Sequence, residues 1–344
     1  MALQNKIKVL IVDDSMVFRE VMSRGISSDP LISVVAKAQD AFDARDKILQ
    51  YEPDVMVCDI EMPKMNGIEF IRRLLPQYSL PIIVVSSVSE AVFDAMKAGA
   101  IDFSVKPNLD FYETVEDFLN DLIIKIKIAV QSKILFNKQV NFSSNIIEGR
   151  SFKTERIIAI GASTGGTEAI YSIIKELPET CPGIVITQHI PPVFSKMFAE
   201  RLNNQTCLYC KEAQNGDILE RGQVLIAPGN YHMAIRKFGD KYKTEVFQDE
   251  RVNGHCPSVD VLFESVAKEA RDKAIGVILT GMGYDGAKGL LSMRRKGART
   301  IGQDEGSSIV YGMPKVAFNI GAVEKQVPLK SISRAIYSML EEQV

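Results

Sequence analysis

The chain has 344 residues and a formal net charge of -2, and its composition is 46% hydrophobic and 24% charged. This length exceeds what one hydrophobic core usually organises, so we expect two domains. The balanced composition excludes a disordered or fibrous chain. The near-neutral charge gives no electrostatic reason to expect nucleic acid as a partner.

The apolar segments are too short to cross a bilayer, so we expect no direct membrane insertion. The first of them, Ile7–Val12, is interrupted by Lys8 and ends at two aspartates, unlike a signal peptide. The five cysteines lack the spacing of a disulfide framework, which indicates a cytoplasmic protein. Cys207 and Cys210 form a C-x-x-C pair, which we interpret as incidental because a zinc site needs two further well-spaced ligands.

Short β-rich runs alternate with segments of helical periodicity in the first third of the chain. This alternation predicts a parallel sheet with helices on both of its faces. The expected strands are residues 9–12, 33–36, 55–58, 82–85 and 103–105.

The pattern changes between residues 110 and 154. An amphipathic stretch at 115–130 predicts the last helix of the first domain, and polar residues follow it. The segment 141–151 is rich in Asn, Ser and charge, so we expect an exposed hinge that proteases cut first. The predicted division is a domain at 1–128, a linker at 129–152 and a second domain at 153–344.

A second α/β pattern follows, with apolar runs at 157–160, 184–187, 224–227 and 275–279. Each run ends in a Gly-rich or polar turn, and ligand sites of open parallel sheets lie beyond such strand ends. The predicted fold class is therefore α/β, with two domains that are each a parallel sheet flanked by helices. We expect the second domain to be doubly wound.

Carboxylates follow two strands of the first predicted sheet. Asp13 and Asp14 come directly after the first strand and Asp59 after the third, so one sheet edge brings them together. Mg²⁺ suits such a cluster, because it is commonly held by one or two carboxylates, waters and phosphate oxygens. Ser86 and Lys106 end the fourth and fifth strands and are suited to contact a phosphoryl group. One acidic residue could merely end a strand, but the five together predict a phosphate-accepting site.

This set, with the run from Asp59 to Gly67, closely resembles two-component receiver domains over about residues 5–125. The resemblance implies a flavodoxin-like fold in which Asp59 accepts a phosphoryl group. The implied Mg²⁺ site consists of Asp14, Asp59, the backbone carbonyl of Glu61, and Asp13 acting through water.

The resemblance also implies which residues sense the phosphate. Ser86 and Lys106 would contact it, and Phe103 matches the family's aromatic switch position. An aromatic residue near a strand is as readily a core residue, so both interpretations of Phe103 stay open.

A serine stands in the glycine-rich turn GASTGG, directly after the first strand of the second domain. A dinucleotide fingerprint would need glycine at Ser163, and a P-loop would need a Gly-Lys-Ser/Thr ending. The remaining interpretation is G-x-S-x-G, a tight turn that exposes the hydroxyl near a helix N-terminus, where amides can stabilise an oxyanion. Ser163 is the candidate nucleophile.

A serine nucleophile needs a base and an acid that orients it. His189 follows the strand 184–187 at the same sheet edge, whereas His232 lies within an apparent strand and His255 in a loop. Asp285 is the best candidate acid, because it lies in a glycine-rich loop after the strand 275–279. Asp304 is the second candidate, and Asp260 is more consistent with a helix start.

The turn GASTGG, QHIPP around His189, GMGYDG around Asp285, and the stretches APGNYHM and GHCPSVDVLFESVA resemble the catalytic domain of chemotaxis protein-glutamate methylesterases, over about residues 153–342. A receiver in front of this domain is the family's full architecture. The resemblance implies the triad Ser163, His189 and Asp285, with the backbone of Met282 contributing to the oxyanion site.

The implied function is a phosphorylation-activated serine hydrolase that releases methanol from glutamate methyl esters on cytoplasmic chemoreceptor helices, the adaptation step of chemotaxis. Deamidation of receptor glutamine is a second activity of some relatives. A chemotaxis histidine kinase would be the phosphodonor, with Mg²⁺ for phosphorylation and no cofactor for hydrolysis. The unphosphorylated receiver would cover the hydrolase cleft.

Spacing supports acyl transfer but does not choose among esters and amides, so the substrate comes from the resemblance alone. Two alternatives stay open: a phosphorylation-gated binding protein whose hydrolase half has lost activity, and a general carboxylesterase with a receiver domain.

Overall fold

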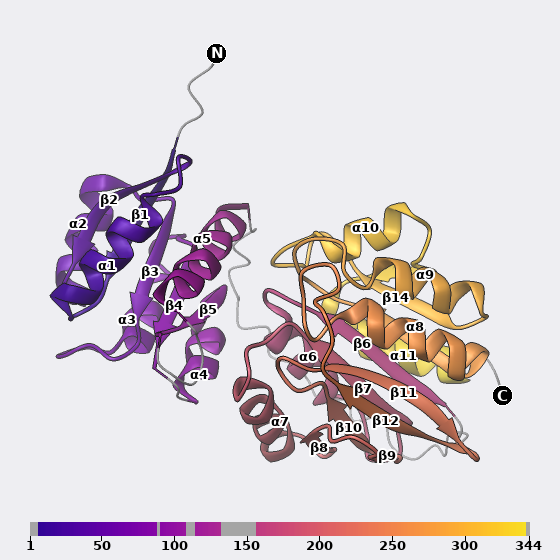
Figure 1. The fold of residues 1–344 in the computed structure, drawn as a ribbon. Helices are drawn as coiled ribbons and strands as arrows, with labels where there is room; N and C mark the ends of the chain where they lie inside the picture. Colours follow the sequence, from indigo (N-terminus) through magenta and orange to yellow (C-terminus); the bar gives the residue numbers. More distant parts are fainter. Residues whose placement is uncertain (1–5, 88–89, 108–113, 132–155, 342–344) are drawn as a thin grey trace. The chain divides into compact units, whose positions relative to one another are not determined.

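The computed structural model describes residues 6–87, 90–107, 114–131 and 156–341. The chain divides into two compact units, Met1–Val140 and Asn141–Val344 (Figure 1). The predicted hinge at 141–151 lies outside the described residues, and so does most of the predicted linker. No helix in the described ranges is long and apolar enough to cross a membrane.

The first unit is a five-stranded parallel sheet in the order β2-β1-β3-β4-β5. This is the strand order of flavodoxin-like doubly wound folds, as predicted. The five predicted strands are confirmed, and each is one or two residues longer than predicted at one end or, for β2, at both ends. The strands are β1 Ile7–Val12, β2 Ile32–Ala38, β3 Val55–Asp59, β4 Ile82–Ser86 and β5 Asp102–Val105.

Helices connect these strands, and α1 packs against α5 while α3 packs against α4. The central strands β3 and β4 are buried along their whole length, which is why they appear in the sequence as continuous apolar runs. The helices are α1 Met16–Ile26, α2 Ala41–Tyr51, α3 Gly67–Leu74, α4 Ala91–Ala98 and α5 Val115–Gln131. Helix α5 continues past the predicted domain boundary at residue 128.

The second unit contains a seven-stranded parallel sheet in the order β15-β14-β13-β6-β7-β10-β8. The four predicted strands of this domain are confirmed as β6, β7, β10 and β13. The strands are β6 Ile157–Ala162, β7 Gly183–Gln188, β8 Tyr209–Glu212, β10 Gln223–Ile226, β13 Ala274–Ile278, β14 Arg299–Gln303 and β15 Lys325–Val327.

A separate three-stranded antiparallel sheet, in the order β11-β12-β9, was not predicted as a sheet. Its strands are β9 Ile218–Leu219, β11 His232–Phe238 and β12 Lys241–Phe247. Strand β11 begins buried and ends exposed, so its sequence lacks the apolar run of a central strand. His232 lies in this strand, as predicted.

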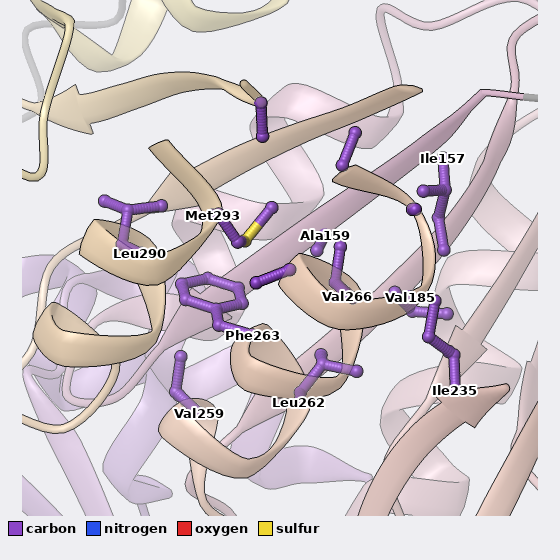
Figure 2. Close-up of a cluster of buried hydrophobic side chains, with 14 of the residues drawn as sticks. Ile157, Ala159, Val185, Ile235, Val259, Leu262, Phe263, Val266, Leu290 and Met293 are labelled. Atoms are coloured by element: carbon purple, nitrogen blue, oxygen red, sulfur yellow. The ribbon is translucent and has the colours of Figure 1, made fainter. Parts of the chain in front are cut away.

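The helices of the second unit are α6 Gly166–Ile174, α7 Phe194–Gln205, α8 Val259–Glu269, α9 Ala287–Arg295, α10 Met313–Asn319 and α11 Ile332–Glu341, with 3₁₀ helices at Arg271–Lys273 and Leu329–Ser331. Helices α8 and α9 pack side by side, with Phe263, Leu290 and Met293 buried between them and the sheet (Figure 2). A Cβ at Gly161 would lie 2.1 Å from Val259 Cγ1, so glycine lets α8 approach β6. This close packing sets the position of the N-terminus of α8 beside the end of β6.

Candidate active site and phosphate-accepting site

Three neighbouring strands of the second sheet carry the predicted triad at their carboxyl ends. Ser163 follows β6, His189 follows β7, and Asp285 lies in the loop after β13, with β6 paired between the other two strands. From β6 the chain continues to β7 on one side of this strand, whereas β13, much later in the sequence, pairs with β6 on the other side. This is a topological switch point, where open α/β sheets bind ligands.

The Ser163 turn is anchored to the loop after β13. The amide of Ser163 donates to the carbonyl of Thr280 at 3.0 Å, and the amide of Gly166 donates to the Ser163 carbonyl at 2.7 Å. A Cβ at Gly281 would lie 2.7 Å from Ser163 Cβ, so glycine is required there. Gly165 has φ 76, a conformation that glycine adopts readily. The serine therefore sits on a tight strand-to-helix turn, as the motif predicts.

Gln188 connects the serine and histidine backbones, which the sequence analysis did not anticipate. Its buried side-chain amide donates to the carbonyl of Ser163 at 2.9 Å and to that of His189 at 3.0 Å. One side chain thus fixes the separation of the two segments that bear the candidate nucleophile and base. Its place directly before His189 was the only signal in the sequence.

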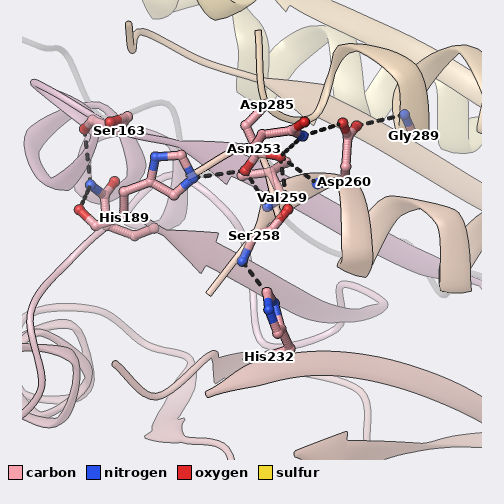
Figure 3. Close-up of polar contacts among 10 residues, drawn as sticks. Ser163, His189, His232, Asn253, Ser258, Val259, Asp260, Asp285 and Gly289 are labelled. Carbon is pink, nitrogen blue, oxygen red and sulfur yellow. Dashed lines mark hydrogen bonds and ion pairs between the residues drawn. The ribbon is translucent and has the colours of Figure 1, made fainter. Parts of the chain in front are cut away.

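The imidazole of His189 lies between Ser163 and the carboxylate of Asp285 (Figure 3). Its Nε2 is 2.8 Å from Asp285 Oδ2, and its Nδ1 is buried without a hydrogen-bond partner among the described residues. An ionised carboxylate only accepts hydrogen bonds, so Nε2 carries the proton and Nδ1 the lone pair. In the serine protease template the acid holds Nδ1 and Nε2 faces the serine, so the two nitrogens exchange roles here.

The carboxylate of Asp285 is 1% exposed and accepts hydrogen bonds from five groups. These donors are His189 Nε2, Ser258 Oγ, Asn253 Nδ2 and the amides of Val259 and Asp260 (Figure 3). Burial opposes ionisation, but the hydrogen bond and charge of His189, with the bonds from Asn253 and Ser258, hold the pKa of Asp285 well below its usual range. Asp285 is therefore a permanent anion beside the imidazole.

The other candidate residues take structural positions. His232 is fully buried, and its Nδ1 accepts the amide of Ser258 at 3.2 Å while its Nε2 bonds the Glu250 carbonyl. Asp304 accepts from the amide and hydroxyl of Ser307 in its own turn. Asp260 lies in the first turn of α8, as expected of a residue near a helix start.

Met282 lies in the loop beside Ser163, because it follows Gly281, where a Cβ would lie only 2.7 Å from Ser163 Cβ. Within the described ranges the amide of Met282 donates no backbone hydrogen bond, whereas the amide of Ser163 is occupied by Thr280. A free amide near a nucleophile is what an oxyanion site requires. This is the observation in favour of the predicted contribution of the Met282 backbone.

The first unit brings the predicted carboxylates together at the ends of β1 and β3. Ligand oxygens of Asp13, Asp14 and Asp59 lie within 4.8 Å of one another. Lys106 Nζ is 2.7 Å from Asp59 Oδ2 and 3.0 Å from Asp13 Oδ2. Three carboxylates and one ammonium leave excess negative charge, so the donor set fits a hard divalent cation such as Mg²⁺.

Titration behaviour follows from this crowding. Burial raises the pKa of Asp59 to about 6, with Lys106 opposing the shift and Asp13 adding to it. Burial alone would lower the pKa of Lys106, but the hydrogen bond and charge of Asp59 raise it. The ammonium is therefore a permanent cation beside the candidate phosphoacceptor.

The predicted phosphate-sensing residues differ in their surroundings. The hydroxyl of Ser86 is buried and has no hydrogen-bond partner among the described residues, so it is able to donate to a phosphoryl oxygen. Phe103 is 5% exposed, and the Lys125 ammonium lies 5.6 Å from its ring centroid. Phe103 is thus a core residue in this structure, in contact with α5.

Fold and site together define a receiver domain joined to a parallel α/β domain that carries a Ser-His-Asp cluster. The CheB methylesterase family matches residues 158–336, and the response regulator receiver domain matches residues 9–115. The chain belongs to the CheB methylesterase family.

Proteins of similar sequence match nearly the whole chain. A protein-glutamate methylesterase/protein-glutamine glutaminase of Syntrophomonas wolfei is 55% identical over 98% of both chains. One of Syntrophotalea carbinolica with the same name is 45% identical, again over 98% of both. The crystal structure of the Thermotoga maritima CheB methylesterase catalytic domain is 35% identical with a TM-score of 0.52, covering 55% of this chain and 98% of that one.

Proposed function

We propose that the protein is a cytoplasmic protein-glutamate methylesterase of chemotaxis, which hydrolyses glutamate γ-methyl esters on chemoreceptor helices and deamidates receptor glutamines as a second activity. The observation that carries the proposal is the convergence of Ser163, His189 and Asp285 at three adjacent strand ends, with His189 bonded to Asp285 at 2.8 Å. The names of the relatives supply the substrate class.

In the proposed reaction, the hydroxyl oxygen of Ser163 attacks the ester carbonyl and its proton passes to Nδ1 of His189. Asp285 stabilises the resulting imidazolium, and the amide of Met282 donates to the oxyanion. The proton then passes to the departing methoxide, so methanol leaves and an acyl-serine remains. Water attacks this ester with His189 as base, which releases glutamate and regenerates the serine. Catalytic hydrogen bonds often tighten only with substrate, so a direct Ser163–His189 bond is expected in the complex.

Regulation is proposed to begin at Asp59, which accepts a phosphoryl group from a chemotaxis histidine kinase. Mg²⁺ held by Asp14, Asp59 and the Glu61 carbonyl, with Asp13 through water, would neutralise charge on the phosphoryl oxygens. Lys106 and Ser86 would then bind these oxygens. The unphosphorylated receiver restrains the catalytic domain, and phosphorylation relieves this restraint by shifting a two-state equilibrium.

The decisive experiment measures methanol release from methylated chemoreceptor membranes, with Mg²⁺ and a small phosphodonor. Ser163→Ala is expected to lose a factor on the order of 10⁴ or more in rate, since triad members act as a unit. Asp59→Asn is expected to keep basal activity and to lose its response to the phosphodonor. Undiminished release by Ser163→Ala would contradict the nucleophile assignment.

A truncated enzyme that begins near residue 150 tests the restraint. Its basal release should exceed that of the unphosphorylated parent, and a truncation no faster than the parent would rule out restraint by the receiver. Small artificial esters turned over faster than methylated receptors would instead favour a general carboxylesterase.

A further inference from the structure

The tight turn Val252–His255 lies directly against the proposed acid and base. Val252 and His255 exchange both backbone hydrogen bonds at 3.0 Å, and the two residues between them have positive φ, 54 at Asn253 and 84 at Gly254. Two positive φ values in a two-residue loop are the pattern of a type I′ turn, which favours Asn-Gly. The turn therefore holds the side chains of Asn253 and His255 in a defined direction.

Asn253 links two buried carboxylates through one amide group. Its Nδ2 donates to Asp285 Oδ1 and to Asp260 Oδ2, both at 2.8 Å. An amide has two N–H donors, so each carboxylate receives one. Without this shared donor, each carboxylate would lose one hydrogen bond, and the repulsion between the two buried acidic groups would be less compensated.

His255 covers a face of the His189 ring. The two imidazoles are stacked, with ring centroids 3.7 Å apart and planes inclined by 14°. Neither ring nitrogen of His255 takes part in a hydrogen bond within the described part of the chain, so its contact with His189 is made through the ring face. Burial, and then the neighbouring His189, lower the pKa of His255 to about 4, so the ring is uncharged at neutral pH.

We propose that the Val252–His255 turn is the positioning element of the catalytic dyad, in which Asn253 holds the Asp285 carboxylate and the flat ring of His255 holds the plane of His189. This inference rests on the proposed roles of His189 and Asp285. An uncharged ring keeps water from that face of the base. It also places π density against the imidazolium that forms during acyl transfer, which favours the charged intermediate.

The test compares His255→Ala, which removes the ring, with His255→Phe, which keeps a flat ring and removes both nitrogens. In the full-length protein, His255→Ala is expected to lower kcat for methanol release about 10-fold to 100-fold with little change in KM, because a misoriented base slows chemistry more than binding. His255→Phe should recover most of this loss. Equal impairment of both variants would overturn the proposal, because it would assign the role to the ring nitrogens.

A spectroscopic readout separates positioning from the proposed activity. The chain has only three histidines, so the downfield proton NMR signal of His189 Nε2–H can be assigned by its loss in His189→Gln. This signal should broaden in His255→Ala through exchange with water and persist in His255→Phe. If the parent releases no methanol, the proposed function fails, while the comparison of signals still decides the positioning role. An unchanged signal in His255→Ala would overturn it.

The turn itself has a matched control. Gly254 and Gly216 have φ of 84 and 87, and a Cβ at either would meet nothing within 4 Å. Both Gly→Ala variants should therefore lose similar stability through backbone strain alone, but only Gly254→Ala should lower kcat. Equal kcat in the two variants would count against the proposal. If His255→Ala does not unfold cooperatively, His255→Leu, which fills the space without a flat ring, replaces it in the comparison of kcat, with the same expected loss.

Discussion

The side chain of Asp285 caps the N-terminus of helix α8, and the side chain of Asp260, in α8, caps the N-terminus of helix α9. Asp285 lies just before α9 and accepts the first amides of α8, those of Val259 and Asp260, whereas Asp260 in α8 accepts the amide of Gly289 in the first turn of α9 at 2.7 Å. The side chain of Ser258, the N-cap residue of α8, accepts no hydrogen bond from the first turn of this helix, and the carboxylate of Asp285 accepts these hydrogen bonds instead. The acid beside His189 is thus held by the same pairing of α8 and α9 that forms the core in Figure 2.

Replacing Asp285 should therefore affect catalysis and stability together. Asp285→Asn is expected to lower kcat by about 10⁴-fold, because the amide no longer holds Nε2–H and the imidazolium is not stabilised. Loss of the charge at the α8 N-terminus should also cost about 1 to 2 kcal/mol of unfolding free energy. Methanol release and denaturant unfolding measure the two effects.

Asp304→Asn is the matched control, because Asp304 was the second candidate acid and its carboxylate, within the described residues, accepts hydrogen bonds from Ser307 in its own turn. Its kcat should equal that of the parent. A strong loss of kcat in this variant, or none in Asp285→Asn, would reverse the assignment of the acid.

Gly166→Ala should displace the side chain of Gln188 and so disturb the position of the Ser163 turn. A Cβ at Gly166 would lie 2.1 Å from Gln188 Oε1 and 2.6 Å from Ala162 Cβ, and Gln188 is the residue that joins the carbonyls of Ser163 and His189. We expect overpacking to cost about 1 to 3 kcal/mol of stability and kcat to fall at least about 10-fold. Gly216→Ala, in open space, should leave kcat unchanged, and equal kcat in both variants would contradict this role of Gln188.

In the absence of Mg²⁺, ionisation of Asp59 should make the receiver domain less stable as the pH rises. Its folded pKa of about 6 exceeds the ordinary value of 3.8. The folded state therefore binds the proton more tightly, and this stabilisation is present below the ordinary value and lost as the pH rises through 6. Asp59→Asn should consequently be more stable than the parent at pH 7, by on the order of 2 to 3 kcal/mol, with the difference vanishing below pH 4.

Denaturant unfolding of the full-length protein at several pH values measures this difference. Asp46→Asn, at an exposed position beside Arg45, is the control and should change nothing. Added Mg²⁺ should narrow the gap by stabilising the ionised cluster of the parent. A less stable Asp59→Asn variant at pH 7 would contradict the electrostatic account.

Ser86→Ala should separate signalling from stability. The buried hydroxyl has no partner among the described residues, so its removal should not cost stability and could add up to about 1 kcal/mol. Basal methanol release should stay unchanged, while its stimulation by a phosphodonor falls several-fold. Ser87→Ala removes an exposed hydroxyl that donates to Glu61 and is the neighbouring control. Full stimulation of Ser86→Ala would argue against phosphate sensing by this residue.

The strands that carry both sites were predictable because buried parallel strands are continuous apolar runs that end in turns. This is why Asp59 and Ser163 were found at strand ends before any contact was known. The antiparallel sheet was missed because β9 has two residues and β11 ends on exposed ones. Local sequence carries little signal for strands that are short or half-exposed.

By itself, the sequence determined the chemical groups and the strand ends that present them, since apolar runs and glycine turns are local properties. Only the tertiary structure decided that Asp285, and not Asp304 or Asp260, meets His189, and that Nδ1 is the nitrogen left free. It also brought Asn253, His255 and Gln188 to the site. These choices depend on how α8 packs against β6 and α9 packs against β13, relationships between distant segments that no local pattern encodes.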